Sequence, residues 1–235
     1  MPESVRRALD LELRLLTCQG RRFETGGRRY ELVPRSLGGE ILLLREIEEL
    51  ELDGDALCRD PMMTLLQTAG SRREASLRVV ARATMRSRED HLDGSLMQMR
   101  IRALDESLDA DELAALLSVV LSDRDMEEYS ELAGLDEEQR LLRRIGAVRG
   151  EESGIESFGG RTLFGRLIDT ACERYGWSYE YVVWGLPREV LELMLRDRQT
   201  ALTISDDERR KLGMRAIGEI DGDSASEEEL RRLTE

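Results

Sequence analysis

The sequence predicts a mainly α protein: a multi-helix bundle with a small N-terminal β-hairpin and a C-terminal module of short helices. Apolar residues make up 40% of the 235-residue chain, whereas aromatic residues make up only 4%. A core built mostly from Leu, Val, Ile, Met and Ala favours helix-on-helix packing over a β-sandwich, which uses more β-branched and aromatic residues. Several segments also space their apolar residues at i, i+3 and i+4, as one face of a helix does.

The N-terminal region predicts the hairpin. Its first 20 residues are charged, and their leucines fit either a strand or a helical turn. In RRFETGGRRYELVPRS, residues 21–36, Gly26 and Gly27 separate two short β-prone runs. A tight primed turn requires positive φ, so paired glycines between such runs indicate a hairpin. Pro34 is expected to end the second strand.

Helix signals begin at Ser36, which is a suitable N-cap for a helix that extends to about Leu52. The apolar positions of this helix are Ile41, Leu42, Leu44, Ile47 and Leu50. The following Asp-Gly-Asp at 53–55 lacks the further ligands of a calcium-binding loop and predicts a turn. Asp60-Pro61 then begins a helix that Gly70 is expected to end.

The middle of the chain predicts further helices. One begins near Ser71 and carries several arginines, and the acidic residues among them favour a solvated face over a surface that grips nucleic acid. Segment 95–106 is expected to be helical. Asp109 and Glu112 form a capping-box pattern before a helix apolar enough to be buried centrally. A short acidic helix over 123–133 is expected to follow.

The expected domain organisation has four parts. Residues 1–150 form the hairpin and the main helical domain, and residues 151–160, rich in Gly, Ser and Glu, form a linker. Residues 161–205 form a C-terminal aromatic helical module, and residues 206–235 form an acidic, flexible tail.

Helix stops divide the aromatic module. One helix is expected to end at Gly176, a short helix capped by Ser178 to end at Gly185, and a third to begin at Pro187. Two interpretations of its aromatic residues remain open, because they can fill a small helical core or form a groove for a partner. The candidate partner-binding residues are Trp177, Tyr181, Trp184, Leu191 and Met194.

Composition excludes several function classes. The net charge is −14, and the arginines are interleaved with acidic residues, so no basic stripe for nucleic acid is expected. The three cysteines are far apart and form no metal-ligand pattern, and no apolar run is long enough to span a membrane. The only histidine, His91, is expected at the surface or in a helix cap. We therefore expect no catalytic residue, cofactor or metal, and a cytoplasmic location. An enzyme that uses His91 and carboxylates is the least favoured alternative.

One stretch resembles a known family. In ERYGWSYEYVVWGLPREVLELML, residues 173–195, the matching residues are Tyr175, Gly176, Trp177, Tyr181, Trp184, Gly185 and Leu191. This segment resembles tail assembly chaperone-like proteins of tailed phages and prophages. The earlier GRRYELVPRSLGGEILLLREIEEL, residues 27–50, is similar to the opening of the same family, and the resemblance extends over residues 21–200.

The resemblance implies a non-enzymatic chaperone without a cofactor. Its client would be the long, apolar tape measure protein, which it keeps soluble in the cytoplasm of a bacterium or an infected host before the tail tube polymerises. High net charge and adaptable methionines suit such a role. The alternative is a structural or adaptor component of a phage-like tail particle. Homo-oligomerisation is left open.

Overall fold

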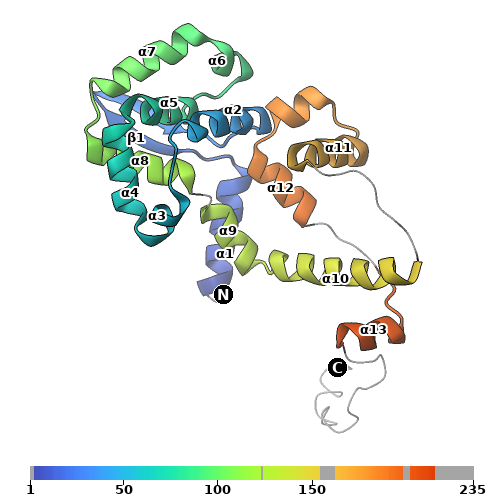
Figure 1. The fold of residues 1–235 in the computed structure, drawn as a ribbon. Coiled ribbons are helices and arrows are strands. Elements are labelled where there is room, and N and C mark those ends of the chain that lie inside the picture. Colours follow the sequence, from blue (N-terminus) through green and yellow to red (C-terminus); the bar gives the residue numbers. More distant parts are fainter. Residues whose placement is uncertain (1–2, 123, 154–161, 198–201, 215–235) are drawn as a thin grey trace, which may run out of the picture. The chain divides into compact units, whose positions relative to one another are not determined.

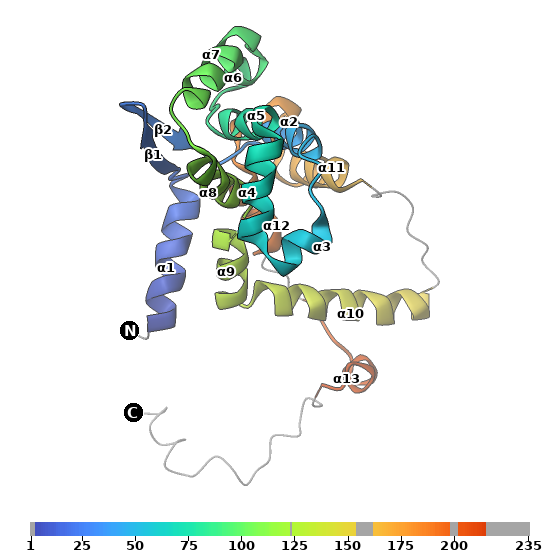
Figure 2. The ribbon, with the colours of Figure 1, turned by 60° about the vertical axis from the view of Figure 1, so that its left-hand side comes forward.

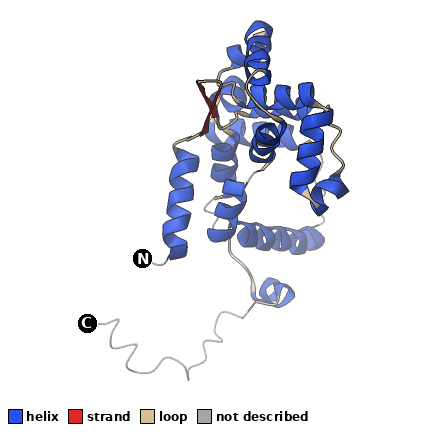
Figure 3. Ribbon diagram, turned by 90° about the vertical axis from the view of Figure 1, so that its left-hand side faces the viewer, coloured by secondary structure: helices blue, strands red, loops and turns tan. Residues whose placement is uncertain are grey.

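The computed structural model describes residues 3–122, 124–153, 162–197 and 202–214. These residues are mainly helical and include one two-stranded antiparallel hairpin, as the sequence predicts (Figures 1 and 3). Contacts divide the chain into two compact units. The first contains Met1–Leu135 and Gly160–Asp197, and the second contains Asp136–Gly159 and Arg198–Glu235.

The N-terminal half of the first unit confirms the hairpin and resolves the ambiguous first segment, which is a helix. Gly26 and Gly27 both have positive φ and form the turn of the hairpin. The elements are α1 (Glu3–Leu16), β1 (Arg21–Thr25), β2 (Arg28–Leu32), α2 (Leu37–Glu48), α3 (Gly54–Arg59), α4 (Pro61–Ser71), α5 (Arg73–Ala83), α6 (Arg88–Leu92), α7 (Gly94–Asp105), α8 (Ala110–Leu121) and α9 (Arg124–Leu132).

Several local expectations change. The Asp-Gly-Asp turn is the start of α3, because the Asp53 carboxylate accepts hydrogen bonds from two backbone N–H groups of the next residues. Helix α4 continues through Gly70, since a glycine inside a helix costs only about 1 kcal/mol relative to alanine. In the middle of α2, Leu43 is buried, whereas Leu44 is exposed. Packing against α5, which the local pattern does not contain, selects this face.

Helix α5 lies at the centre of the bundle. It contacts α2, α4, α7 and α8 (Figure 2). Its buried residues are mostly small: Ala75, Ser76, Leu77, Val79, Val80, Ala81 and Ala83. Small side chains allow neighbouring helices to approach closely, and the larger Leu104, Leu113 and Leu117 of α7 and α8 fill the remaining space. The arginine-rich sequence around α5 does not make a basic surface, because its arginines pair with acidic residues of neighbouring elements.

The rest of the first unit is the aromatic module, made of α11 (Leu163–Tyr175), the π-helical turn η1 (Tyr181–Gly185) and α12 (Arg188–Arg196). The expected helix stops are present: Gly176 caps α11 with φ of 66°, and Pro187 immediately precedes α12. The contacts group this module with the N-terminal bundle, which differs from the expected separate domain.

The second unit contains α13 (Asp206–Leu212) and most of α10 (Leu135–Ser153). Arg149 of α10 pairs with Glu208 of α13 at 2.6 Å, and this hydrogen bond holds the pKa of Glu208 well below its usual range. Helix α10 includes the first residues of the expected linker, and α13 lies within the expected flexible tail. Residues 154–160 of that linker and 215–235 of that tail lie outside the described residues.

Candidate functional site

The five candidate partner-binding residues lie in or beside η1 and α12 of the aromatic module. The module shares one apolar cluster with Leu37, the first residue of α2. The buried members are Leu37, Ala171, Val182, Leu186, Val190 and Leu191. The module therefore completes its core with a side chain from the N-terminal bundle, which explains why the contacts place the two in one unit.

Backbone contacts strengthen this junction. Arg188 N–H donates to the Arg35 carbonyl oxygen at 2.7 Å, and Ser36 forms an isolated antiparallel bridge with Pro187. Ser36 also caps α2, since its Oγ accepts from the Gly39 N–H. The start of α2 and the start of α12 are thus held side by side.

Two adjacent glycines at the start of α2 make room for large rings. A Cβ on Gly38 would lie 2.7 Å from ring atoms of Trp184, and a Cβ on Gly39 would lie 2.8 Å from Nε2 of His91. Contacts this short do not occur for real side chains, so glycine is needed at both positions unless the rings move. The packing of the Trp184 ring against Gly38 therefore holds η1 against α2.

His91 is buried, with 7% of its surface exposed, so the expectation of a surface position is wrong. The ring is covered because α6 places it against Gly39, with the Trp184 ring centroid 6.1 Å away. Its Nδ1 is buried and has no hydrogen-bond partner among the residues that the structure describes. Burial, reinforced by the Arg82 cation and opposed by Asp90, lowers the pKa of His91 from 6.5 to about 4, so the ring is neutral near pH 7. A neutral histidine wedged between α2 and η1 stabilises the junction by packing.

The remaining aromatic residues form a short stack. Tyr175 stacks on Trp177 with centroids 4.5 Å apart, and Tyr181 meets Trp177 edge-on at 5.3 Å. The Tyr175 hydroxyl donates to the Met194 carbonyl oxygen at 3.1 Å, which fixes α11 to α12. The three rings therefore pack mainly against one another, as offset and edge-on aromatic pairs do in protein cores.

The structure separates the five candidates. Leu191 is fully buried and belongs to the core, so a partner cannot reach it at the surface. Trp184, Trp177 and Met194 are half-buried in the contacts already described. Only Tyr181 is exposed, at 44% of its surface, and its neighbour Tyr179, which the sequence did not single out, is exposed at 62%. The five residues do not form a single exposed groove.

A different apolar surface lies on α1. Leu11 and Leu15 of this helix are buried with Met126 and Tyr129 of α9 and with Leu193 of α12. Four other apolar side chains of α1 are between 44% and 59% exposed: Val5, Leu9, Leu13 and Leu16. We call these four residues the α1 stripe. A helix with two apolar stripes on different faces signals a second contact surface, and the sequence contains this signal once the segment is known to be helical.

Other classes of site lack support in the part of the chain that the structure describes. No group of three or more His, Cys, Asp or Glu side chains is arranged to hold a metal ion among these residues. None of the described helices is both long and apolar enough to cross a membrane. No protein-family model, curated protein or solved structure matches the chain.

Proposed function

We propose that this protein is a non-enzymatic binding protein that holds an apolar helical segment of another protein against α1. The resemblance of residues 27–50 and 173–195 to tail assembly chaperone-like proteins suggests the specific role: binding a tape measure-type client in the cytoplasm during assembly of a phage or prophage tail. The α1 stripe is the observation that supports client binding.

The geometry of the stripe favours a helical occupant. Its members are spaced by four, four and three residues, so they form one ridge along a 14-residue helix. Such ridges pack into the groove between side chains of a second helix. Burying apolar surface stabilises a complex by about 25 cal/mol per Å², so covering four half-exposed side chains supplies a driving force.

Other exposed side chains suit a client whose sequence varies. Met62 and Met63 on α4 and Met99 on α7 are each about half or more exposed. Methionine adapts its shape to different apolar targets because its side chain is unbranched and flexible. The net charge of −14 would keep a complex with an apolar client soluble.

The test is co-expression with a tape measure-type client. The wild-type protein should raise the soluble fraction of the client and co-purify with it. The double variant Leu9→Gln and Leu13→Gln should lose this effect, since glutamine keeps helix propensity but removes the apolar ridge.

Leu92→Gln is the matched control, because Leu92 of α6 is 62% exposed, similar to Leu13, but lies outside the stripe. This variant should behave as the wild type. Client rescue that survives the double variant, with helicity unchanged by circular dichroism, would contradict the proposal.

A further inference from the structure

A pocket of about 430 Å³ lies between the hairpin and α7. The residues that line it come from β2 and α7: Arg28, Arg29, Tyr30, Met99, Arg100 and Ala103. We call these six residues the hairpin–α7 patch. The two elements are fixed to each other, because the hydroxyl of Thr25 at the end of β1 donates to the carbonyl oxygen of Ser107, just after α7, at 3.0 Å. The patch is thus a fixed feature of the first unit.

One face of the hairpin is balanced in charge. The Nε of Arg29 lies 3.5 Å from a carboxylate oxygen of Glu24, its partner across the ladder. Arg22 and Glu31 form the next such pair, at 3.9 Å. Opposite charges across a ladder attract each other, so each arginine of this face has a countercharge within the hairpin.

The opposite face carries Arg28, because successive side chains of a strand point to opposite sides. Its partner across the ladder is Thr25, which has no charge. The next pair on this face is Tyr30 with Phe23, whose rings stack with centroids 5.2 Å apart. Arg28 is exposed, and its side chain has no hydrogen-bond or ion-pair partner among the residues that the structure describes. A positive charge is therefore left at this side of the pocket.

Arg100 brings a second positive charge to the pocket from α7. Its Nη1 donates to Thr84 Oγ1 at 2.8 Å, and its guanidinium carbon lies 5.6 Å from the centroid of the Tyr30 ring. Both contacts hold the guanidinium group in place, but neither supplies a carboxylate. The residues three and four positions away in α7, which are its neighbours on the helix surface, are uncharged: Leu96, Met97, Ala103 and Leu104.

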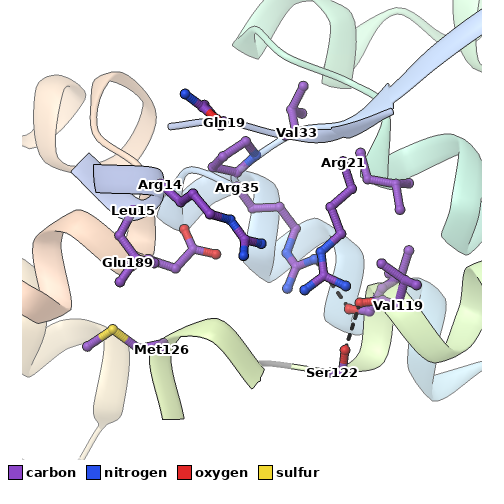
Figure 4. Close-up of a pocket in the computed structure, with 14 residues that line it drawn as sticks. Arg14, Leu15, Gln19, Arg21, Val33, Arg35, Val119, Ser122, Met126 and Glu189 are labelled. Carbon is purple, nitrogen blue, oxygen red and sulfur yellow. Dashed lines mark hydrogen bonds between the residues drawn. The ribbon is translucent and has the colours of Figure 1, made fainter. Parts of the chain in front are cut away.

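None of the described residues that line this pocket carries a carboxylate. The pocket in Figure 4 differs, because Glu189 lies there among three arginines: Arg14, Arg21 and Arg35. In the hairpin–α7 patch, three arginines have one carboxylate partner, the Glu24 that pairs with Arg29, so two positive charges remain. This surplus is local, because the chain as a whole carries −14.

The patch also has an apolar part. Met99, next to Arg100, is 60% exposed, and its flexible side chain can adapt to an apolar group. A cavity of about 150 Å³ holds benzene, so a pocket of about 430 Å³ has room for more than one side chain. Guanidinium groups bind carboxylates through paired N–H donors. Together these features fit a peptide segment better than a free small ion.

We propose that the hairpin–α7 patch binds a short acidic segment of another protein. Carboxylates of this segment contact Arg28 and Arg100, and an apolar side chain covers Met99. A short segment is favoured over nucleic acid, since a long polyanion also meets the rest of a chain that carries −14. The patch shares no residue with the α1 stripe, so this inference does not depend on the proposed client.

The experiment is a fluorescence anisotropy titration of the full chain with a short labelled peptide that contains several glutamates and a central leucine. Saturable binding is expected. A peptide with glutamine in place of glutamate should bind about tenfold more weakly or worse, because charge-assisted contacts are lost. Binding should persist in the double variant Leu9→Gln and Leu13→Gln, which lacks the ridge of the α1 stripe. Absence of saturable binding, equal binding of the glutamine peptide, or loss of binding in this double variant would overturn the inference.

Arg28→Gln should weaken binding of the glutamate peptide about tenfold, and the fold should stay intact because this side chain is exposed. The matched control is Arg22→Gln, which removes the same charge from the other face of the hairpin, where the Arg22 side chain is 82% exposed. This control should bind as the wild type does. Equal weakening by both variants would indicate only general attraction between charges, and tighter binding of a single-stranded RNA of similar length would indicate a nucleic-acid surface. Either result would contradict a site for an acidic segment.

Discussion

The aromatic module contains both tryptophans of the chain, whereas α1 contains no aromatic residue and yet exposes four of its six Val and Leu side chains. In the module, rings stack on each other and occupy a recess over Gly38, so most of their surface is covered within the chain. Of the six Val and Leu side chains of α1, only Leu11 and Leu15 are buried. The comparison shows that aromatic richness alone does not mark a binding surface. An apolar stripe left over after the core is complete is the better indicator.

The largest expected effect is a change in the free energy of unfolding, and it should differ between the two regions. Leu191→Ala should lower the free energy of unfolding by about 2–5 kcal/mol, because it leaves a cavity in the core of the module. Leu13→Ala in the α1 stripe should change it by no more than about 0.5 kcal/mol, as for other exposed positions. Urea unfolding of both variants measures the difference. Equal destabilisation would show that the stripe is part of the folded core.

Acidification should loosen the junction that holds the module. The pKa of His91 is about 4 in the folded chain and 6.5 in the reference state, so the unfolded chain binds the proton first as pH falls. The stability that depends on neutral His91 is present above pH 6.5 and is lost as pH falls toward 4, by about 3 kcal/mol in total.

His91→Gln is the control for this pH effect. The variant should show a shallower loss of unfolding free energy across the same pH range, because its side chain does not titrate. The comparison requires urea unfolding at several pH values between 6.5 and 4. Identical pH slopes for the variant and the wild type would contradict the assigned role of His91.

A smaller effect is expected from a single methyl group at the recess for Trp184. Gly38→Ala should destabilise the fold by about 1–3 kcal/mol, since the new Cβ overlaps the ring. Gly70→Ala is the matched control: Gly70 lies within α4 with open space around its Cβ position. That variant should stabilise the fold by up to about 1 kcal/mol, because alanine has the higher helix propensity. Thermal unfolding should therefore shift in opposite directions for the two variants.

The smallest effect is expected at the exposed edge of the aromatic module. Tyr179→Ala should change the unfolding free energy by less than about 0.5 kcal/mol, since this side chain is largely exposed. Client retention should also stay at the wild-type level if α1 is the binding surface. A marked loss of retention in this variant would move the partner site back to the aromatic module.

Local sequence predicts most element boundaries because caps and stops act over a few residues. Ser36, Asp60-Pro61, Asp109 with Glu112, Gly176 and Pro187 all stand at the helix ends where they were expected. The two wrong predictions, a turn at residues 53–55 and a helix end at Gly70, also concern local features. Aspartate fits either a turn or the N-cap of a helix, and glycine can either end a helix or lie inside one.

The candidate site was harder to predict, because exposure depends on residues far apart in the chain. The sequence left open whether the tryptophans fill a core or face a partner, and in the structure Trp184 packs against Gly38 and His91 of the N-terminal bundle. His91 looked exposed beside charged neighbours, but α6 turns it onto Gly39. The two stripes of α1 could not be told apart before α9 and α12 covered one of them.

The sequence by itself determined the mainly helical class, the hairpin at Gly26–Gly27 and the caps that begin and end the helices, because these follow from backbone geometry and hydrogen bonds between near neighbours. Only the tertiary structure decided which apolar faces are covered, that the aromatic module shares a core with α2, and that Arg14 of α1, Arg21 of β1 and Arg35 lie around one pocket. Burial and charge clustering are sums over contacts between distant segments, and no local pattern contains those contacts.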